Sequence, residues 1–346
     1  MKAILRWITA LSLCCASTFT FAGSLPGSGS FGVGYNEAWF GDRYSFDLTS
    51  AGFDQNYVYT MFDGMAKGGA TIVRIWPFAG LQGIQLNQSA PQTQGLRPDV
   101  MANLNTVLWF AQYRRLKVYV TLLIGGDMQN ASGPRRDYYY NLLANKYGEG
   151  DAFKWNVLYP FLNLLNYWHT YYPDAIYALD LINEIEAALN SNYFPDYWIG
   201  ARSWIQNMTV FVKSISPWLA VTSTAGFDYA VPEITYGLFS GVGLDFYDLH
   251  AYADAGQYPG QTSLCRKVSA DNVPIILGEY GQKSKTYNDN LQYSATANFI
   301  YGAKTHCFSA ALAWKYETSQ TWLTYRKTDG SFRPAYYLIQ YYGTPH

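Results

Sequence analysis

The stretch Ile176-Tyr-Ala-Leu-Asp-Leu-Ile-Asn-Glu184 is an almost continuous apolar run that ends in a carboxylate. The stretch Pro274-Ile-Ile-Leu-Gly-Glu279 has the same form. Short apolar runs of this kind are typical of strands that are buried on both faces, as in a parallel sheet. A carboxylate is costly to desolvate without a partner, so the two glutamates need a reason to stand at the ends of buried strands.

Eight strand-like runs alternate with helix-like stretches along the chain. The strand-like runs are 31–36, 71–78, 117–124, 176–183, 219–223, 246–250, 274–278 and 308–314, and the helix-like stretches include 57–67, 99–113, 155–169, 198–215 and 290–303. Eight such units in one domain predict an α/β protein with a single (β/α)8 TIM barrel, which we place at residues 31–346. An open doubly wound sheet is the alternative, but the first strand-like run is not followed by a glycine-rich phosphate turn.

The N-terminus has the features of an export signal. Residues 1–22 begin with a basic segment, continue with an apolar core and end in small residues before Gly23. This pattern predicts a signal peptide cleaved after Ala22, followed by a flexible segment at 23–30. A membrane anchor is disfavoured because the apolar core is short and interrupted by polar residues. We therefore expect a periplasmic or extracellular protein.

The composition narrows the possible ligands. The net charge is −1 and there is no basic run, which argues against a nucleic-acid partner. With only four His and no CxxC or HExxH motif, we expect neither a metal nor a cofactor. Beyond the signal segment, Cys265 and Cys307 either form one disulfide or remain two buried thiols. Aromatic residues make up 18% of the chain, including 32 Tyr and 11 Trp; their rings either fill core and surface or stack on sugars.

In a (β/α)8 barrel, the carboxyl ends of all strands meet at one mouth. The residues at these ends are Arg74 and Trp76 on the second strand, Asn183 and Glu184 on the fourth, His250 and Tyr252 on the sixth, Glu279 on the seventh and Trp314 on the eighth. The fourth and seventh strands lie on opposite sides of the mouth, so Glu184 and Glu279 can face each other across a sugar. Two facing carboxyl groups are what glycoside hydrolysis requires.

Their neighbours predict different roles for the two glutamates. Arg74 would keep Glu279 ionised and nucleophilic, and Tyr252 could donate a hydrogen bond to the same carboxylate. Glu184 would act as the proton donor, with a pKa raised by burial and by the second negative charge.

Other residues at the mouth would bind or orient the substrate. Asn183 could bond a sugar 2-hydroxyl, and His250 could orient substrate hydroxyls or the acid/base. Trp314 would offer a stacking surface. Further candidates for sugar stacking are Trp39, Trp76, Trp198 and Trp322. Glu186 could compete with Glu184, although we place it in the following loop, and Glu37 is a lesser candidate for a substrate ligand.

Taken in order, these motifs resemble the clan A glycoside hydrolases, and most closely the cellulase-like family 5. The resemblance rests on Val73-Arg74-Ile75, Asn183-Glu184, His250-Ala-Tyr252, Gly278-Glu279 and Trp314. It implies a retaining double displacement with Glu184 as acid/base and Glu279 as nucleophile. The chain departs from the family pattern at Ile185, where many relatives have Pro, and at Ile124-Gly-Gly126, where many have His.

We therefore expect a secreted, retaining endo-β-glycosidase that acts as a monomer on a polysaccharide or oligosaccharide such as a β-1,4-glucan or β-mannan. A carbohydrate-binding pseudoenzyme and a transglycosylase that uses the same covalent intermediate are the alternatives. The distance between the two carboxyl groups tests the mechanism, because about 5–5.5 Å favours retention and about 6.5–9.5 Å favours inversion.

Overall fold

A computed structural model describes residues 30–39, 46–87, 92–226, 230–254, 261–318 and 322–343. The predicted signal peptide and nearly all of the segment at 23–30 lie outside these ranges. Among the described helices, none combines the length and apolar character that crossing a membrane requires.

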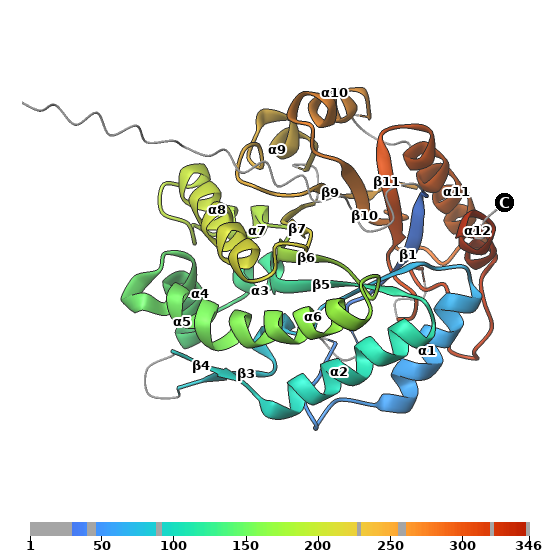
Figure 1. The fold of residues 1–346 in the computed structure, drawn as a ribbon. Coiled ribbons are helices and arrows are strands. Elements are labelled where there is room, and N and C mark those ends of the chain that lie inside the picture. The colour runs from blue at the N-terminus through green and yellow to red at the C-terminus, as the bar shows by residue number, and fades with distance from the viewer. Residues whose placement is uncertain are drawn as a thin grey trace, which may run out of the picture.

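Nine parallel strands form one sheet that curves into a barrel (Figure 1). They are β1 (Gly32–Glu37), β2 (Ile72–Ile75), β5 (Lys117–Ile124), β6 (Ile176–Asn183), β7 (Val221–Thr222), β8 (Thr224–Ala225), β9 (Tyr247–Tyr252), β10 (Ile275–Gly281) and β11 (Phe308–Ala313), in the order β7-β6-β5-β2-β1-β11-β10-β9-β8. Only Ser223 separates β7 from β8; β7 pairs with β6 and β8 pairs with β9. These two short strands thus fill one barrel position, and the predicted (β/α)8 barrel is confirmed.

The strand register brings residues from distant parts of the chain side by side. Asn36 on β1 is opposite Arg74 on β2, and His250 on β9 is opposite Glu279 on β10. All the strands run parallel, so these residues lie toward the same, carboxyl-terminal mouth of the barrel.

Helices surround the sheet and cover its outer face (Figure 1). The longer ones are α1 (Gln55–Lys67), α2 (Pro98–Tyr113), α4 (Gly133–Leu143), α6 (Tyr159–Tyr171), α8 (Trp198–Ile215), α10 (Gln261–Asp271), α11 (Asp289–Thr305) and α12 (Pro334–Gly343). Shorter elements are α3 (Gly125–Gln129), α5 (Glu149–Phe153), α7 (Glu186–Asn190), α9 (Ala230–Tyr236), 3-10 turns at Ala79–Leu81 and Lys146–Gly148, a π-helical turn at Lys154–Leu158, and the antiparallel hairpin of β3 (Ile84–Leu86) and β4 (Thr93–Leu96).

Helix α1 illustrates how the sequence directs these elements. The Asp54 side chain accepts hydrogen bonds from the backbone N–H groups of Asn56 and Tyr57, which caps the helix. The buried residues Val58, Met61, Phe62 and Met65 recur at helical spacing and face the sheet. Burying each such side chain contributes roughly 1.5–3 kcal/mol.

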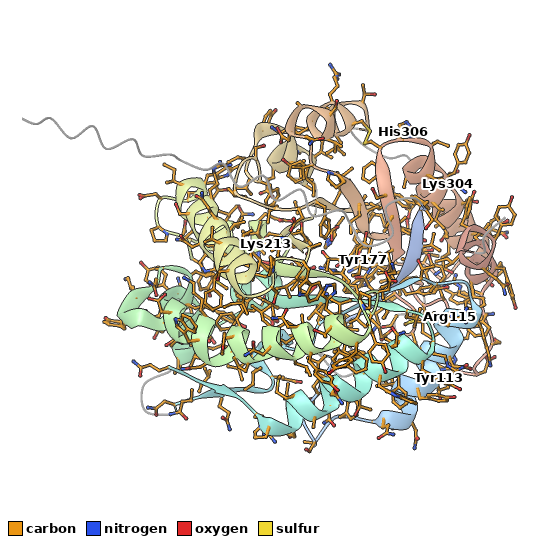
Figure 2. The ribbon with its side chains drawn as sticks, in the orientation of Figure 1. Tyr113, Arg115, Tyr177, Lys213, Lys304 and His306 are labelled. Carbon is orange, nitrogen blue, oxygen red and sulfur yellow. A yellow bond between two sulfur atoms is a disulfide. The ribbon has the colours of Figure 1, made fainter. Side chains whose placement is uncertain are left out.

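The barrel interior is apolar toward the amino ends of its strands and polar toward the mouth. The apolar cluster consists of Ile72, Tyr119, Tyr177, Ala178, Ala220, Phe246, Ile276, Ala310 and Leu312. Tyr177 belongs to this cluster, whereas Tyr113 at the end of α2 is exposed; both are labelled in Figure 2. This cluster fills the amino-terminal end of the barrel interior.

The two cysteines form a disulfide and are not free thiols. Cys265 on α10 and Cys307, just before β11, are joined by a disulfide with their Cα atoms 5.5 Å apart. The bond ties an outer helix to the start of a barrel strand.

Candidate active site

Arg74 is fully buried and links four strands at the barrel mouth. Its Nη1 donates to Glu279 Oε1 at 2.6 Å and to Asn36 Oδ1 at 3.0 Å. Its Nη2 donates to Asn183 Oδ1 at 2.7 Å and to Asp180 Oδ2 at 2.8 Å. A buried guanidinium is stable only with such partners, so this network fixes the positions of the side chains around it.

Both carboxylate oxygens of Glu279 accept hydrogen bonds. Arg74 donates to Oε1, and the Tyr252 hydroxyl donates to Oε2 at 2.8 Å. Burial raises the pKa of Glu279 above its ordinary value, and His250, Arg74 and Tyr252 oppose that rise. The two contacts expected from the sequence are therefore present, and they stabilise the ionised form of Glu279.

Glu184 follows β6 in a left-handed backbone conformation, with φ of 52°. For a residue other than glycine this conformation costs roughly 1–3 kcal/mol and must be held by its surroundings. Thr224 holds it: its Oγ1 accepts from the Glu184 N–H at 2.8 Å, and its carbonyl accepts from the Ile185 N–H at 3.2 Å. The turn directs the Glu184 side chain, which is 16% exposed, toward the mouth.

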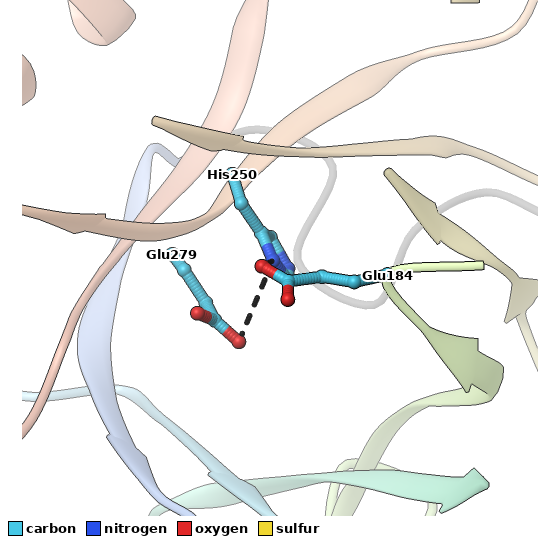
Figure 3. Close-up of side chains that lie close together, drawn as sticks. All are labelled: Glu184, His250 and Glu279. Carbon is cyan, nitrogen blue, oxygen red and sulfur yellow. Dashed lines mark hydrogen bonds and ion pairs between the residues drawn. The ribbon is translucent and has the colours of Figure 1, made fainter. Parts of the chain in front are cut away.

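Glu184 and Glu279 face each other beside His250 (Figure 3). One carboxylate oxygen from each glutamate and one ring nitrogen of His250 all lie within 4.8 Å of one another. His250 Nδ1 is 3.0 Å from Glu184 Oε1 and 3.5 Å from Glu279 Oε1. Glu184 has fewer stabilising donors than Glu279, and burial raises its pKa to about 7. The two carboxyl groups therefore have different environments.

His250 is neutral at the pH where Glu184 titrates. Burial lowers its pKa to about 3, and Arg74 adds to that effect while Glu279 opposes it. A neutral imidazole can donate through Nδ1 to an ionised Glu184 or accept there from a protonated one. His250 can thus stay hydrogen-bonded to Glu184 in both protonation states.

Two buried aspartates, Asp180 and Asp248, lie beneath this layer. The Tyr119 hydroxyl donates to Asp248 Oδ2 at 2.6 Å, while Asp180 accepts from Thr121 as well as from Arg74. Burial raises the pKa of Asp180 to about 6 and that of Asp248 to about 8. We did not single out these aspartates from the sequence. A signal was present, because Asp248 and His250 are two residues apart on one strand and so share a face.

The spacing of Glu184, His250 and Glu279 would also allow them to ligate a metal ion. The buried Arg74 guanidinium already neutralises Glu279 from 2.6 Å and would repel a cation bound there. The donor set therefore suits proton transfer and nucleophilic attack better than metal binding.

Three tryptophans predicted to bind substrate come together at the mouth. The ring of Trp314 lies 5.2 Å from that of Trp76 and 5.5 Å from that of Trp39, between ring centroids. Trp322 packs against the same cluster. Trp198, at the start of α8, instead packs against the large core between sheet and helices.

Two minor predictions from the sequence are wrong. Glu186 is not in a loop but in the first turn of α7, where it is buried and hydrogen-bonded to the Gly226 N–H. Glu37 is fully buried at the end of β1 and pairs with Lys315 at 3.0 Å, so it cannot reach a substrate. In both cases the carboxylate is held by a residue distant in sequence, Gly226 for Glu186 and Lys315 for Glu37.

Comparison with solved structures finds the same fold. A β-1,4-D-mannanase from Cryptopygus antarcticus matches with a TM-score of 0.66 and 14% identity, over 88% of this chain and 93% of that one. An exo-β-1,4-mannosidase from Opitutaceae bacterium strain TAV5 matches with a TM-score of 0.67 and 14% identity, over 94% of this chain and 61% of that one. A glycoside hydrolase family 5 mannosidase from Rhizomucor miehei matches with a TM-score of 0.60 and 14% identity, over 91% and 92%.

These likenesses confirm the fold that the resemblance to family 5 implies. No protein-family model matches the sequence, and no curated protein matches it.

Proposed function

We propose that this chain is a retaining glycoside hydrolase that cleaves a β-1,4-linked polysaccharide, with Glu184 as acid/base and Glu279 as nucleophile. The observation that carries the proposal is the pair itself. Two carboxyl groups approach within 4.8 Å at the mouth of a barrel, one paired with an arginine and a tyrosine and the other with a pKa near 7.

In the first step, Glu279 attacks the anomeric carbon while Glu184 gives its proton to the departing glycosidic oxygen. The glycosidic C–O bond breaks, and an ester bond forms between the sugar and Glu279. In the second step, Glu184 takes a proton from a water molecule, whose oxygen displaces Glu279 from the anomeric carbon. A carboxyl separation of about 5–5.5 Å is typical of this double displacement, and the approach of the two glutamates supports it over inversion.

The surroundings supply the asymmetry that the two roles need. A nucleophile must be ionised, and Arg74 and Tyr252 stabilise that form of Glu279. An acid must hold its proton until the leaving oxygen takes it, and burial raises the pKa of Glu184 to about 7. The Asn183 side chain, whose Oδ1 accepts from Arg74, would donate its amide N–H to a sugar hydroxyl next to Glu184.

For the substrate, we propose β-1,4-mannan attacked within the chain, with β-1,4-glucan second. The fold neighbours named as mannanases and mannosidases support the choice of sugar. The tryptophan cluster of Trp39, Trp76 and Trp314 supports a sugar ligand, because indole rings stack on the apolar faces of pyranose rings. We also propose that the protein is exported, from its N-terminal sequence, and acts as a monomer, since one chain supplies both carboxylates.

The test is release of reducing ends from β-mannan and β-glucan by the wild-type protein and by Glu279→Gln and Glu184→Gln. Both substitutions should lower turnover at least about 100-fold, in line with the contribution of a nucleophile or a general acid. Glu317→Gln is the matched control, since Glu317 pairs with Arg326 away from the two carboxylates. Near wild-type cleavage by Glu279→Gln would contradict the assignment.

The same samples separate the alternatives. Retention predicts that the first product seen by NMR has the β configuration. A protein that binds mannan but releases no sugar would be a binding pseudoenzyme. Products longer than the substrate, formed when an acceptor sugar is added, would identify a transglycosylase.

A further inference from the structure

The carboxyl group of Glu184 rests directly on Gly226, the residue that follows β8. A Cβ atom at position 226 would lie 2.6 Å from both Cγ and Cδ of Glu184, and closer still to its Oε1. Real Cβ atoms do not approach other atoms so closely, so no side chain fits here unless Glu184 moves. Gly226 therefore limits how far the Glu184 carboxyl group can move away from the mouth of the barrel.

Gly226 is in turn held by a pair of buried glutamates. Its N–H donates to Glu186 Oε1 at 2.6 Å, and the Glu186 carboxyl group lies beside that of Glu233 on α9. Glu186 is 2% exposed and Glu233 is 5% exposed. Within the described residues, Glu186 Oε2 and Glu233 Oε2 are buried and have no donor.

Two carboxylate oxygens are both acceptors, so they bond to each other only when one carries a proton. A proton shared between Glu186 and Glu233 satisfies both orphaned oxygens and removes one of the two buried charges. Burial raises the pKa of both groups, that of Glu233 to about 8, which agrees with a shared proton at neutral pH. A further titratable group, Glu184, adjoins this pair, and its ionised form raises the pKa of Glu186.

We propose that Glu186, Glu233 and Gly226 form a positioning unit for the acid/base, in which a proton-sharing carboxyl pair anchors the glycine against which Glu184 rests. The inference depends on the proposed role of Glu184. In this role the three residues act through Glu184 and not on the substrate. If Glu186 and Glu233 were both ionised, they would repel each other. The repulsion would move Glu186 away from Gly226, and the pair would carry two negative charges beside Glu184 instead of one.

A second glycine completes this support from the other side. A Cβ atom at Gly125, at the start of α3, would collide with the carbonyl oxygen of Glu184 and lie 2.9 Å from that of Asn183. The backbone of Glu184 thus rests on Gly125 and its side chain on Gly226. Gly126 differs, because a Cβ atom there would meet nothing within 4 Å, which makes Gly126→Ala a matched control.

The test compares Gly226→Ala with Gly126→Ala on two substrates, β-mannan and 2,4-dinitrophenyl β-mannobioside. Dinitrophenolate leaves without a proton, so kcat/KM for that substrate does not depend on the acid. General acids contribute roughly 10²–10⁴-fold, so a displaced Glu184 should lower kcat/KM on mannan by at least about 30-fold. The dinitrophenyl substrate should change by less than about 3-fold, and Gly126→Ala should match the wild type on both.

Variants at Glu233 test the shared proton. In Glu233→Gln the amide can donate to Glu186 Oε2 as the shared proton does, whereas Glu233→Ala leaves that oxygen without a donor. We expect Glu233→Ala to reproduce the substrate-dependent loss of Gly226→Ala, and Glu233→Gln to restore activity on mannan. Equal losses on the two substrates in Gly226→Ala would overturn the inference, as would equal activities of Glu233→Ala and Glu233→Gln.

Failure of the proposed function has a different signature. If the wild-type protein cleaves neither substrate, Glu184 is not an acid/base. The inference then fails together with the proposed function. If the wild type is active, a crystal structure of Gly226→Ala decides the geometry: the Glu184 carboxyl group should move by about 1 Å or more. An unmoved Glu184 with a substrate-independent loss would leave only a folding defect and would refute the positioning unit.

Discussion

Replacing Arg74 by lysine should damage both stability and turnover, although the charge is kept. The two terminal nitrogens of Arg74 make four hydrogen bonds to side chains on three other strands, and no part of the side chain is exposed. A lysine ammonium is a single point and cannot occupy both positions. We expect two charge-assisted bonds to be lost, each contributing about 1.5–3 kcal/mol. The predicted decrease in the free energy of unfolding is therefore about 3–6 kcal/mol, against a total of about 5–15 kcal/mol for a folded domain.

Urea unfolding near neutral pH, followed by tryptophan fluorescence, measures this loss. The midpoint should fall while the dependence on urea stays constant, because the surface exposed on unfolding is unchanged. Arg97→Lys is the control: Arg97 also makes two bonds, but only to the neighbouring Asp99 on the surface, and its midpoint should barely move. A decrease of less than about 1 kcal/mol for Arg74→Lys, with mannan hydrolysis intact, would refute the view that this network organises the site.

Four further predictions concern the backbone turn, the acid, the buried aspartate and the disulfide. Thr224→Val removes the acceptor for the Glu184 N–H and should cost about 1–3 kcal/mol in urea unfolding and lower kcat, whereas Thr224→Ser should restore both. Because the pKa of Glu184 is raised to about 7, kcat/KM on mannan should fall as pH rises through about 7; a limb that survives in Glu184→Gln would belong to another group. The pKa of Asp248 is raised from 3.8 to about 8, so the folded protein holds a proton that the unfolded chain releases above about pH 4. The free energy of unfolding should therefore fall between about pH 4 and pH 8, and Asp248→Asn should flatten that dependence when unfolding is measured across the range. Cys265 and Cys307 are 42 residues apart, so replacing both by alanine should destabilise the protein by up to about 4 kcal/mol in urea unfolding, with unchanged activity at low temperature.

The sequence predicted the barrel well because hydrophobic runs report burial directly. The runs at 117–124 and 176–183 coincide with β5 and β6. The run at 219–223 was less accurate, because the strand breaks at Ser223 and resumes as β8 at Thr224, beyond the predicted end. The hairpin of β3 and β4 was not anticipated, since it lies between barrel units where tertiary contacts decide the structure.

The ends of the strands showed which residues gather at the mouth, but not how they pair. Alternation along a strand indicates the face on which a side chain lies, not the partner that it meets there. Lys315, the partner of Glu37, is 278 residues away along the chain, and Glu233, the partner of Glu186, lies on a separate short helix. The left-handed turn at Glu184 also left no sign in the sequence, because it depends on Thr224 from the neighbouring barrel position.

The closure of the barrel also fixes when, during synthesis, the site can exist. Strand β1 pairs with β11, where Val33 is opposite Ala311, and Arg74 binds Glu279 across 205 residues. A ribosome releases the amino-terminal strands first, so Arg74, Asp180 and Asn183 emerge before the carboxylate that completes their network. Contacts of such long sequence separation form slowly because the intervening chain must first be ordered. Any truncated product that stops before β10 lacks Glu279, so Arg74 keeps only Asp180 as an ion-pair partner and the two proposed catalytic carboxylates cannot come together.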